Sequence, residues 1–529
     1  MTTDGLLFQT LGHAGVRCVL DGMTLLCDPW LSETGSFLAS WHVFPPNDHL
    51  PRAPLLAPDL VYVSHIHEDH FDRDFLAQVS KSATVLIPSF PDKRLRTQLR
   101  DLGFRSVVEL ESFETHRVSP SVELTIVTKD MPHWHDSALL IRAGDQTVLH
   151  QNDCKLSEPQ IARIHARFPR IDVLYNQFSP ANWYPMAYHY EPEKERRIKG
   201  LEREQYMNVF LRYVELLRPR LVVPFAGPPA LLDRSLLPHC LGADSIFPML
   251  PDAVERVHAL RAAGRVSSRV ETLLPGDTVR LPAMEVERDP HWRTFDFARK
   301  DEYLLDYARR REPVIAAYLA AIPEARPDLY ERFARRMNDL VGAHPYLARR
   351  VSMPVLFEIR GAHGGDWLVD FRKDRDVVSR VEPAHPSPYG FDIESRFLQA
   401  VLDGRLTFDA LFLSLRFAAH RDPDLYSEDL MTLLKRDDRD SLNLIERHLR
   451  AGAKKEYAEI ESEGRRYRIE KFCPHAGGNL QLAGVKDGVL TCPVHGWQFR
   501  LSDGRCLTAR SRNLEVSEVG AVVESERRP

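Results

Sequence analysis

"PDLVYVSHIHEDHFD", residues 58–72, joins a short apolar run to a cluster of histidines and acids. Residues 60–63 have the composition of a buried strand, and the loop that follows carries the pattern His-x-His-x-Asp-His. A loop that leaves the end of a buried strand can direct four such side chains at one point. Imidazole and carboxylate groups bind zinc, iron and manganese alike, so the stretch predicts a metal site without choosing the metal.

The sequence around this stretch alternates strand-like and helical segments. "RCVLDGMTLLCDPW" (residues 17–30) predicts two strands joined by a turn at Asp21-Gly22. "REQYMNVFLRYVELLRP" (residues 203–219) has helical spacing. Further strand-like runs with polar ends are "SATVLIPS" (82–89), "VELTIVTKD" (122–130), "ALLIRAGDQTVLHQND" (138–153), "IDVLYNQFS" (171–179) and "PRLVVPFAG" (219–227). Many strands with helices between them predict a layered α/β sandwich.

From about residue 289 the sequence becomes rich in Arg and Ala, with apolar residues at helical spacing and a few strand-like runs. We expect an α+β middle region without a chemical motif, in which His344 and His420 are surface or packing residues. "LLKRDDRDSLN" (residues 433–443) is charge-rich and suits a linker. We therefore predict three domains: a metal-binding domain at 1–285, the α+β middle region at 286–437 and an all-β domain at 438–529.

A second constellation lies in "CPHAGGNLQLAGVKDGVLTCPVHGWQF", residues 473–499. Cys473 and His475 form a Cys-x-His pair, and after sixteen intervening residues Cys492 and His495 form a Cys-x-x-His pair. This is the pattern of a Rieske 2Fe-2S cluster, with two thiolates on one iron and two imidazoles on the other. The intervening "LQLAGVKDGVLT" predicts a strand-turn-strand that brings the two loops together.

The competing interpretation of this constellation is a zinc site with two cysteines and two histidines. Zinc fingers usually group cysteine with cysteine and histidine with histidine, whereas here the pairs alternate and "HGWQF" follows. The pattern therefore favours an all-β Rieske domain. It resembles the ferredoxin and ring-hydroxylating type, because Ala476 and Val494 stand where the respiratory type has additional cysteines.

The first constellation resembles the metallo-β-lactamase fold superfamily, together with "LGHAGV" (residues 11–16) and "LLCDPW" (residues 25–30). The resemblance implies an N-terminal αββα sandwich with a metal site at the ends of its strands. It further implies that His65 and His67 bind a first metal, and that Asp69 and His70 bind a second.

The same resemblance implies ligands from later loops. "MPHWHDSALLI" supplies His133, with Ser137 four residues on, and His135 is the alternative. The bridging carboxylate would be Asp153, and Asp28 would orient a ligand histidine.

The sequence departs from the superfamily at one place. Where a last histidine usually follows a late strand, this chain has "VVPFAGPP" (residues 222–229). The second metal then lacks a ligand unless His189 or His239 supplies it, so one metal or an asymmetric pair is expected.

The two constellations together predict redox chemistry. A hydrolase needs no electrons, because its metal polarises a bond and lowers the pKa of bound water. A Rieske cluster on the same chain suits a metal that changes its oxidation state. We therefore expect non-haem iron, one or two ions, in an oxidoreductase: a Rieske-dependent monooxygenase that inserts oxygen from O2 into a small polar metabolite or nucleotide sugar. The alternative is a zinc hydrolase, a lactonase or phosphodiesterase, with a redox-sensing Rieske domain.

The chain also resembles the CMP-N-acetylneuraminate hydroxylase family, which joins these two kinds of domain. The resemblance covers "HQNDC" (150–154), "NQFSPANWYP" (176–185), "LVVPFAGPP" (221–229) and "GRLTFDALFLSLRFAAHRDPDLY" (404–426). The animal enzymes carry the Rieske domain first, whereas here it comes last, which leaves a nucleotide sugar and another small metabolite both open as substrate.

Composition limits the partners and the location. The formal net charge of −5 and the lack of a basic stripe with aromatics argue against nucleic acid. No apolar run reaches the ~18 residues of a membrane span, and no secretory signal is visible. Seven scattered cysteines are too few for a disulfide framework, so we expect a cytoplasmic protein. Without a Gly-x-Gly-x-x-Gly loop between a strand and a helix, the electrons would come from a separate ferredoxin or reductase.

Overall fold

The computed structural model describes residues 6–132, 134–436, 438–452, 455–475, 477–494, 496–510 and 512–521. The chain forms two compact units. Unit 1 comprises Met1–Pro323 and Asp409–Arg416, and unit 2 comprises Glu324–Phe408 and Phe417–Pro529. A division into three domains at residues 285 and 437 stays a prediction. Within the described ranges, no helix is both long and apolar enough to cross a membrane.

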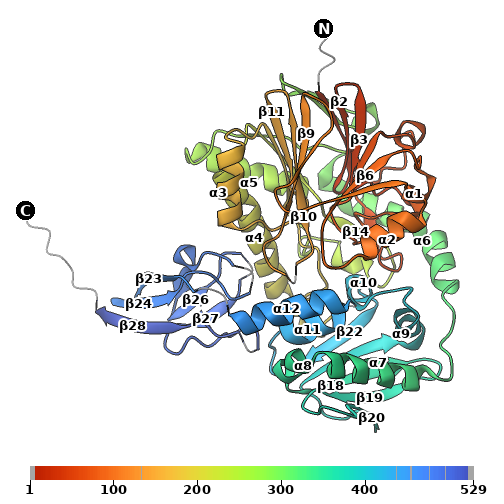
Figure 1. Cartoon of the computed structure of the whole chain (residues 1–529), viewed down its shortest axis with the longest axis vertical. Helices are drawn as coiled ribbons and strands as arrows, with labels where there is room; N and C mark the ends of the chain where they lie inside the picture. The colour runs from red at the N-terminus through yellow and green to blue at the C-terminus, as the bar shows by residue number, and fades with distance from the viewer. Residues whose placement is uncertain are drawn as a thin grey trace, which may run out of the picture. The chain divides into compact units, whose positions relative to one another are not determined.

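Unit 1 contains two mixed sheets (Figure 1). In spatial order, the eight-stranded sheet consists of β17 (Glu285–Glu287), β16 (Thr278–Leu281), β1 (Leu6–Gly12), β2 (Gly15–Leu20), β3 (Met23–Cys27), β5 (Leu60–Tyr62), β6 (Thr84–Pro88) and β7 (Ser106–Leu110). The seven-stranded sheet consists of β15 (Arg269–Val270), β13 (Leu221–Phe225), β12 (Val173–Gln177), β11 (Gln146–His150), β10 (Ser137–Ala143), β9 (Val122–Thr128) and β8 (Thr115–Arg117). A small antiparallel pair, β4 (Trp41–Val43) and β14 (Pro229–Leu231), stands apart from both sheets.

The predicted hairpin is present. Strands β2 and β3 pair antiparallel, and Leu20 lies opposite Met23. Asp21 and Gly22 both have positive φ, 50° and 78°, which is the conformation that a two-residue turn between twisted strands requires.

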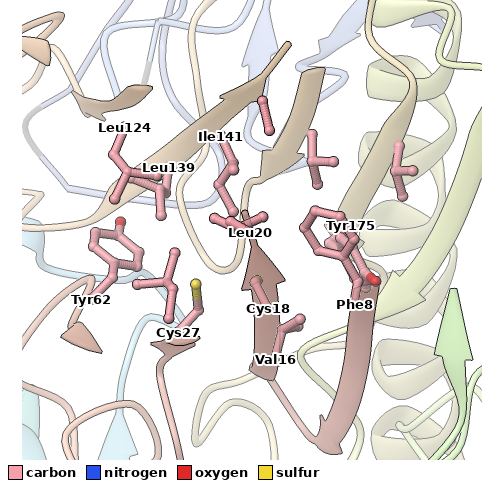
Figure 2. Close-up of a cluster of buried hydrophobic side chains, with 14 of the residues drawn as sticks. Phe8, Val16, Cys18, Leu20, Cys27, Tyr62, Leu124, Leu139, Ile141 and Tyr175 are labelled. Atoms are coloured by element: carbon pink, nitrogen blue, oxygen red, sulfur yellow. The ribbon is translucent and has the colours of Figure 1, made fainter. Parts of the chain in front are cut away.

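The two sheets pack face to face around one apolar core (Figure 2). Along β2, alternate residues Val16, Cys18 and Leu20 point into this core, as the two-residue period of a strand requires. Side chains of the other sheet, among them Leu139 and Tyr175, meet them there (Figure 2).

Helices cover the outer faces of both sheets (Figure 1). The helices of unit 1 are α1 (Arg73–Gln78), α2 (Arg94–Asp101), α3 (Glu158–Arg167), α4 (Pro192–Leu217), α5 (Leu250–Ala262) and α6 (Lys300–Ala320). Val61 in β5 packs in one outer core with Phe75 of α1, and Val222 in β13 packs in another with Phe210 of α4. Because strands such as β5 and β13 are buried on both faces, they are apolar throughout rather than alternating. This four-layer arrangement confirms the predicted αββα sandwich.

Unit 2 begins with the predicted α+β region. Its five-stranded sheet consists of β20 (Val378–Val381), β19 (Gly365–Asp370), β18 (Pro354–Arg360), β21 (Tyr389–Glu394) and β22 (Phe417–Arg421). Its helices are α7 (Leu329–Ala343), α8 (Pro345–Val351), α9 (Ser395–Leu402), α11 (Glu428–Lys435) and α12 (Arg439–Ala451). Helix α10 (Phe408–Leu413) begins in unit 2, and from Asp409 onward its residues belong to unit 1. His344 is buried and His420 exposed.

The C-terminal part of unit 2 is built of strands, as predicted. One sheet contains β23 (Tyr457–Ser462), β24 (Arg465–Glu470) and β28 (Val516–Ala521), and the other contains β25 (Gly484–Lys486), β26 (Val489–Thr491) and β27 (Gln498–Arg500). β25 and β26 form the predicted strand-turn-strand, with Lys486 opposite Val489.

Candidate metal centres

The histidine loop follows β5 and brings His65 and His67 together. His65 Nε2 lies 2.9 Å from His67 Nδ1. Burial lowers the pKa of His65 well below its usual value, so its imidazole is neutral, the form that binds metals. Two ring nitrogens that face each other at this distance suit a shared ion.

Asp69, His70 and Asp153 form a second group beside the first. His70 Nε2 lies 3.6 Å from Asp69 Oδ2 and 3.7 Å from Asp153 Oδ1. These distances exceed a hydrogen bond but match the ~3.4 Å between atoms that share a tetrahedral ion at bonds of ~2.1 Å. His65, His70 and Asp153 each offer a ligand atom within 4.8 Å of the other two.

The electrostatics of this group favour a cation. Burial alone would lower the pKa of His70, but the nearby carboxylates Asp69, Asp153 and Asp28 raise it well above its usual value. Among the described residues, His70 Nε2 and Asp69 Oδ1 are buried atoms without a hydrogen-bond partner. Orphaned polar atoms cost free energy unless a ligand satisfies them, so the residues present fit a bound metal.

His13 joins this group, although it was not among the predicted ligands. It lies in the tight turn between β1 and β2 with φ of 49°, and its Nε2 is 3.0 Å from Asp69 Oδ2. His13, Asp69 and His70 each place a ligand atom within 4.8 Å of the others. His13 is therefore a candidate for the ligand that the second metal was predicted to lack. The available signal was the histidine of "LGHAGV" itself, which the resemblance had used only to recognise the opening hairpin.

Asp28, at the end of β3, holds the loop in place. Its Oδ1 accepts a hydrogen bond from the Ser64 backbone N–H at 2.7 Å, and its Oδ2 accepts one from Ser64 Oγ at 2.7 Å. The same Oδ2 lies 2.9 Å from His70 Nδ1. With Nδ1 bound in this way, Nε2 of His70 faces Asp69 and Asp153.

Asp409 performs the corresponding task for His67. Its Oδ2 lies 3.1 Å from His67 Nε2, on the side of the ring away from His65. The hydrogen bond to this carboxylate raises the pKa of His67, against the effect of burial. Arg416 fixes the end of the same segment, donating from Nη1 to Asp233 Oδ2 at 3.1 Å and from Nε to the Leu38 carbonyl at 3.0 Å. The sequence carried no local signal for Asp409, which is 342 residues from His67.

Four further histidines were predicted or considered as ligands of the N-terminal centre: His133, His135, His189 and His239. His133 lies outside the described residues. Its alternative, His135, stacks on the Phe90 ring with centroids 5.0 Å apart. His189 is exposed and His239 half-buried, and within the described ranges neither belongs to a group that could hold a metal.

The second constellation brings its two loops together in unit 2. Cys473 and Cys492 are both buried in the same apolar cluster. A Cβ added at Gly478, in the first loop, would lie 2.8 Å from Cys492 Sγ in the second, so only glycine leaves room for the sulfur. The His475 ring stacks on Trp497, with centroids 4.2 Å apart and planes 5° apart. His495 lies outside the described residues.

A buried carboxylate lies beside the cluster loops. His475 Nε2 is 3.6 Å from Oε2 of Glu428, the first residue of α11. Burial raises the pKa of the Glu428 carboxyl to about 7. The neighbouring Asp429 pairs with Arg350 at 3.1 Å and with Arg512 at 3.3 Å, which ties α11 to the chain on both sides of it.

Comparison with known proteins agrees with both constellations. Residues 436–517 match the family model of the Rieske [2Fe-2S] domain, and residues 8–177 match that of the beta-lactamase superfamily domain. A Rieske 2Fe-2S iron-sulfur protein of Mycobacterium tuberculosis is 32% identical over 96% of this chain and 99% of its own length. The chain belongs to this family of Rieske iron-sulfur proteins. A Mycolicibacterium smegmatis protein of the same description is 31% identical over 96% of this chain and 99% of its own.

Two further proteins are similar to parts of this chain. The cytidine monophosphate-N-acetylneuraminic acid hydroxylase of Danio rerio is 28% identical over 41% of this chain and 37% of its own. Among solved structures, CmlA, a diiron beta-hydroxylase from Streptomyces venezuelae, is 22% identical over 53% of this chain and 55% of its own, with a TM-score of 0.36.

Replacement of His13 by alanine tests the second group. We expect His13→Ala to lower the metal content by about one equivalent, because Asp69 and His70 lose a neighbouring ligand. The visible spectrum of the C-terminal cluster should not change. His49→Ala is the control, since His49 is a half-buried histidine of unit 1 whose Nε2 lies 3.1 Å from the Pro275 carbonyl. Unchanged metal content in His13→Ala, measured by elemental analysis, would remove His13 from the site.

Replacement of Asp409 by asparagine tests the orientation of His67. Asn keeps the size of the side chain but loses the charge, so we expect the affinity for metal to fall ~10–100-fold, the usual cost of losing the carboxylate behind a ligand histidine. Competition with a coloured chelator measures this affinity. Asp306→Asn, at an exposed carboxylate on α6, is the control. Equal affinities in all three proteins would show that Asp409 does not support the ligand.

Proposed function

We propose that this protein is a Rieske-coupled oxygenase that hydroxylates a small polar metabolite. The observation that carries the proposal is the presence, on one chain, of Rieske cluster loops and a separate buried His/Asp centre. Family relationship with Rieske proteins and partial similarity to a hydroxylase support an oxidoreductase.

The donor set of the N-terminal centre suits non-haem iron. Histidines and carboxylates, without a cysteine in either group, bind iron as well as zinc. His65 and His67 would hold one ion, and His13, Asp69 and His70 a second, with Asp153 between them. Bound iron would supply one-electron chemistry with O2, which zinc cannot. The Rieske cluster, held by Cys473, His475, Cys492 and His495, would deliver single electrons.

The residues of the chain have separate roles in this proposal. Asp28 and Asp409 position His70 and His67 through the ring nitrogens that face away from the ligand groups. Ser64, held by Asp28, also contacts His65 Nδ1 at 2.9 Å, which leaves Nε2 directed at His67. The centre thus presents a fixed set of nitrogen and oxygen atoms to an ion and needs little reorganisation.

The partners follow from the same chemistry. The substrate is a small molecule, and the similarity to a hydroxylase acting on a cytidine monophosphate sugar makes nucleotide sugars one candidate class. The electron donor is a separate ferredoxin or reductase.

The metal identity distinguishes this proposal from a hydrolase. After anaerobic purification we expect iron, in excess of the two atoms of the cluster, and little zinc. Zinc in the N-terminal centre, with iron confined to the cluster, would instead indicate a metal-dependent hydrolase with an accessory Rieske domain.

Loss of the cluster tests the electron path. Cys492→Ser replaces a thiolate by a hydroxyl, a much poorer ligand for this iron, so we expect the cluster spectrum to disappear while N-terminal iron remains. That iron should then no longer be reduced by a physiological donor, although dithionite still reduces it; electron paramagnetic resonance follows both reactions.

The matched control is Cys506→Ser. Cys506 is equally buried in the same apolar cluster but lies outside the two ligand pairs. It should keep both the cluster and donor-driven reduction. If N-terminal iron is reduced by the donor at an unchanged rate in Cys492→Ser, the proposed electron path is wrong.

A further inference from the structure

A lysine stands beside the candidate metal centre in unit 1. Lys155 follows Asp153 by two residues, in the loop between β11 and α3, and is half-buried. Its Nζ donates to Oε1 of Gln177, the last residue of β12, and Gln177 Nε2 donates to Asp153 Oδ1 at 2.7 Å. One amide therefore fixes the ammonium group at a set position relative to a candidate ligand.

The ammonium has no carboxylate within ion-pair distance in the part of the chain that the structure describes. Lys199 on α4 shows the usual arrangement: it is half-buried too, with 14% of its side chain exposed, and pairs with Glu195 at 2.6 Å. A partly buried cation is costly unless an anion pairs with it. Gln177 links Lys155 to the carboxylate of Asp153 by hydrogen bonds. A metal ion bound to Asp153 would compete with Lys155 for the negative charge of that carboxylate.

Polar and aromatic side chains contact Lys155 and each other. The Tyr206 ring lies below the ammonium, with Nζ 5.7 Å from its centroid. Asn182 Nδ2 donates to the Tyr206 hydroxyl at 3.1 Å, and Asn182 Oδ1 accepts from the Tyr184 backbone N–H at 2.8 Å. These contacts connect Asp153, through Gln177 and Lys155, to Tyr206 on α4. Asn182 then connects Tyr206 to the backbone of Tyr184.

We propose that Lys155 forms an anion subsite that binds a carboxylate or phosphate group of the substrate beside the metal centre. Gln177 and Tyr206 hold the ammonium in place, and no carboxylate of the described residues lies within ion-pair distance of it, so an oxyanion is the partner that fits. A charge-assisted hydrogen bond to Lys155 would orient the substrate. This inference rests on the proposed function, because it assigns the class of molecule that the oxygenase would take: a small organic anion.

Binding of simple anions tests the subsite without turnover. Inorganic phosphate and acetate are titrated into the holoprotein by calorimetry, with Lys155→Met, Lys155→Arg and Lys199→Met as variants. We expect Lys155→Met to lower the affinity for one of the two anions about tenfold or more, as the loss of a charge-assisted hydrogen bond predicts. Lys155→Arg should keep most of the affinity, and Lys199→Met should behave like the wild type. If only phosphate binding is lost, the substrate is phosphorylated. If only acetate binding is lost, the substrate is a carboxylic acid.

A second measurement needs no substitution, in case Lys155→Met loses metal. Reductive methylation of the wild-type holoprotein, followed by peptide mass spectrometry, should show that phosphate or acetate protects Lys155 but not Lys199. If neither anion protects Lys155, or if Lys155→Met with full metal binds both anions as the wild type does, the subsite does not exist. Because anion binding requires no electron transfer, this outcome is independent of the Cys492→Ser and metal-identity experiments.

Discussion

The candidate N-terminal metal centre depends on one buried carboxylate, Asp28. A carboxylate with no solvent contact is stable only when its oxygens are hydrogen-bonded, and Asp28 takes its partners from Ser64 and His70. These contacts connect the end of β3 to the loop after β5, its parallel neighbour in the sheet. Removal of Asp28 would release Ser64 and His70 together, and with Ser64 the contact to His65.

The sandwich explains why these side chains meet. β3 and β5 run parallel in one sheet, and β11 and β12 run parallel in the other, so the loops after each pair emerge at one edge of their sheet. Asp28 and the histidine loop come from the first pair, and Asp153 and Gln177 from the second. The core between the sheets, which includes Phe8 and Tyr175, holds the two edges next to each other (Figure 2). Candidate metal ligands and the proposed anion subsite are therefore products of the same packing.

In each candidate centre, one predicted ligand histidine contacts an acidic residue that is distant in sequence, and both acidic residues come from the same stretch of the chain. Asp409 contacts His67 within unit 1, and Glu428 lies near His475 within unit 2. The stretch from residue 409 to residue 428 passes from one unit to the other between Arg416 and Phe417. Residues 409–428 thus supply an acidic neighbour to one candidate ligand histidine in each centre. The predicted division at residues 285 and 437 places this whole segment in the middle region.

Sequence alone determined the features that depend on local spacing. The His-x-His-x-Asp-His run after an apolar strand, the alternating Cys-His pairs and the Asp21-Gly22 turn are each complete within a few residues, so their chemistry can be predicted before the chain folds. Only the tertiary structure decided which distant groups join them. His13 approaches Asp69 because the turn between β1 and β2 lies beside the histidine loop, and Asp409 reaches His67 because residues 409–416 belong to unit 1. Asp409 has no local pattern that distinguishes it, and "LGHAGV" marks His13 without saying which residue it contacts. In both cases the packing of sheets and segments sets the partner, not the neighbours in sequence.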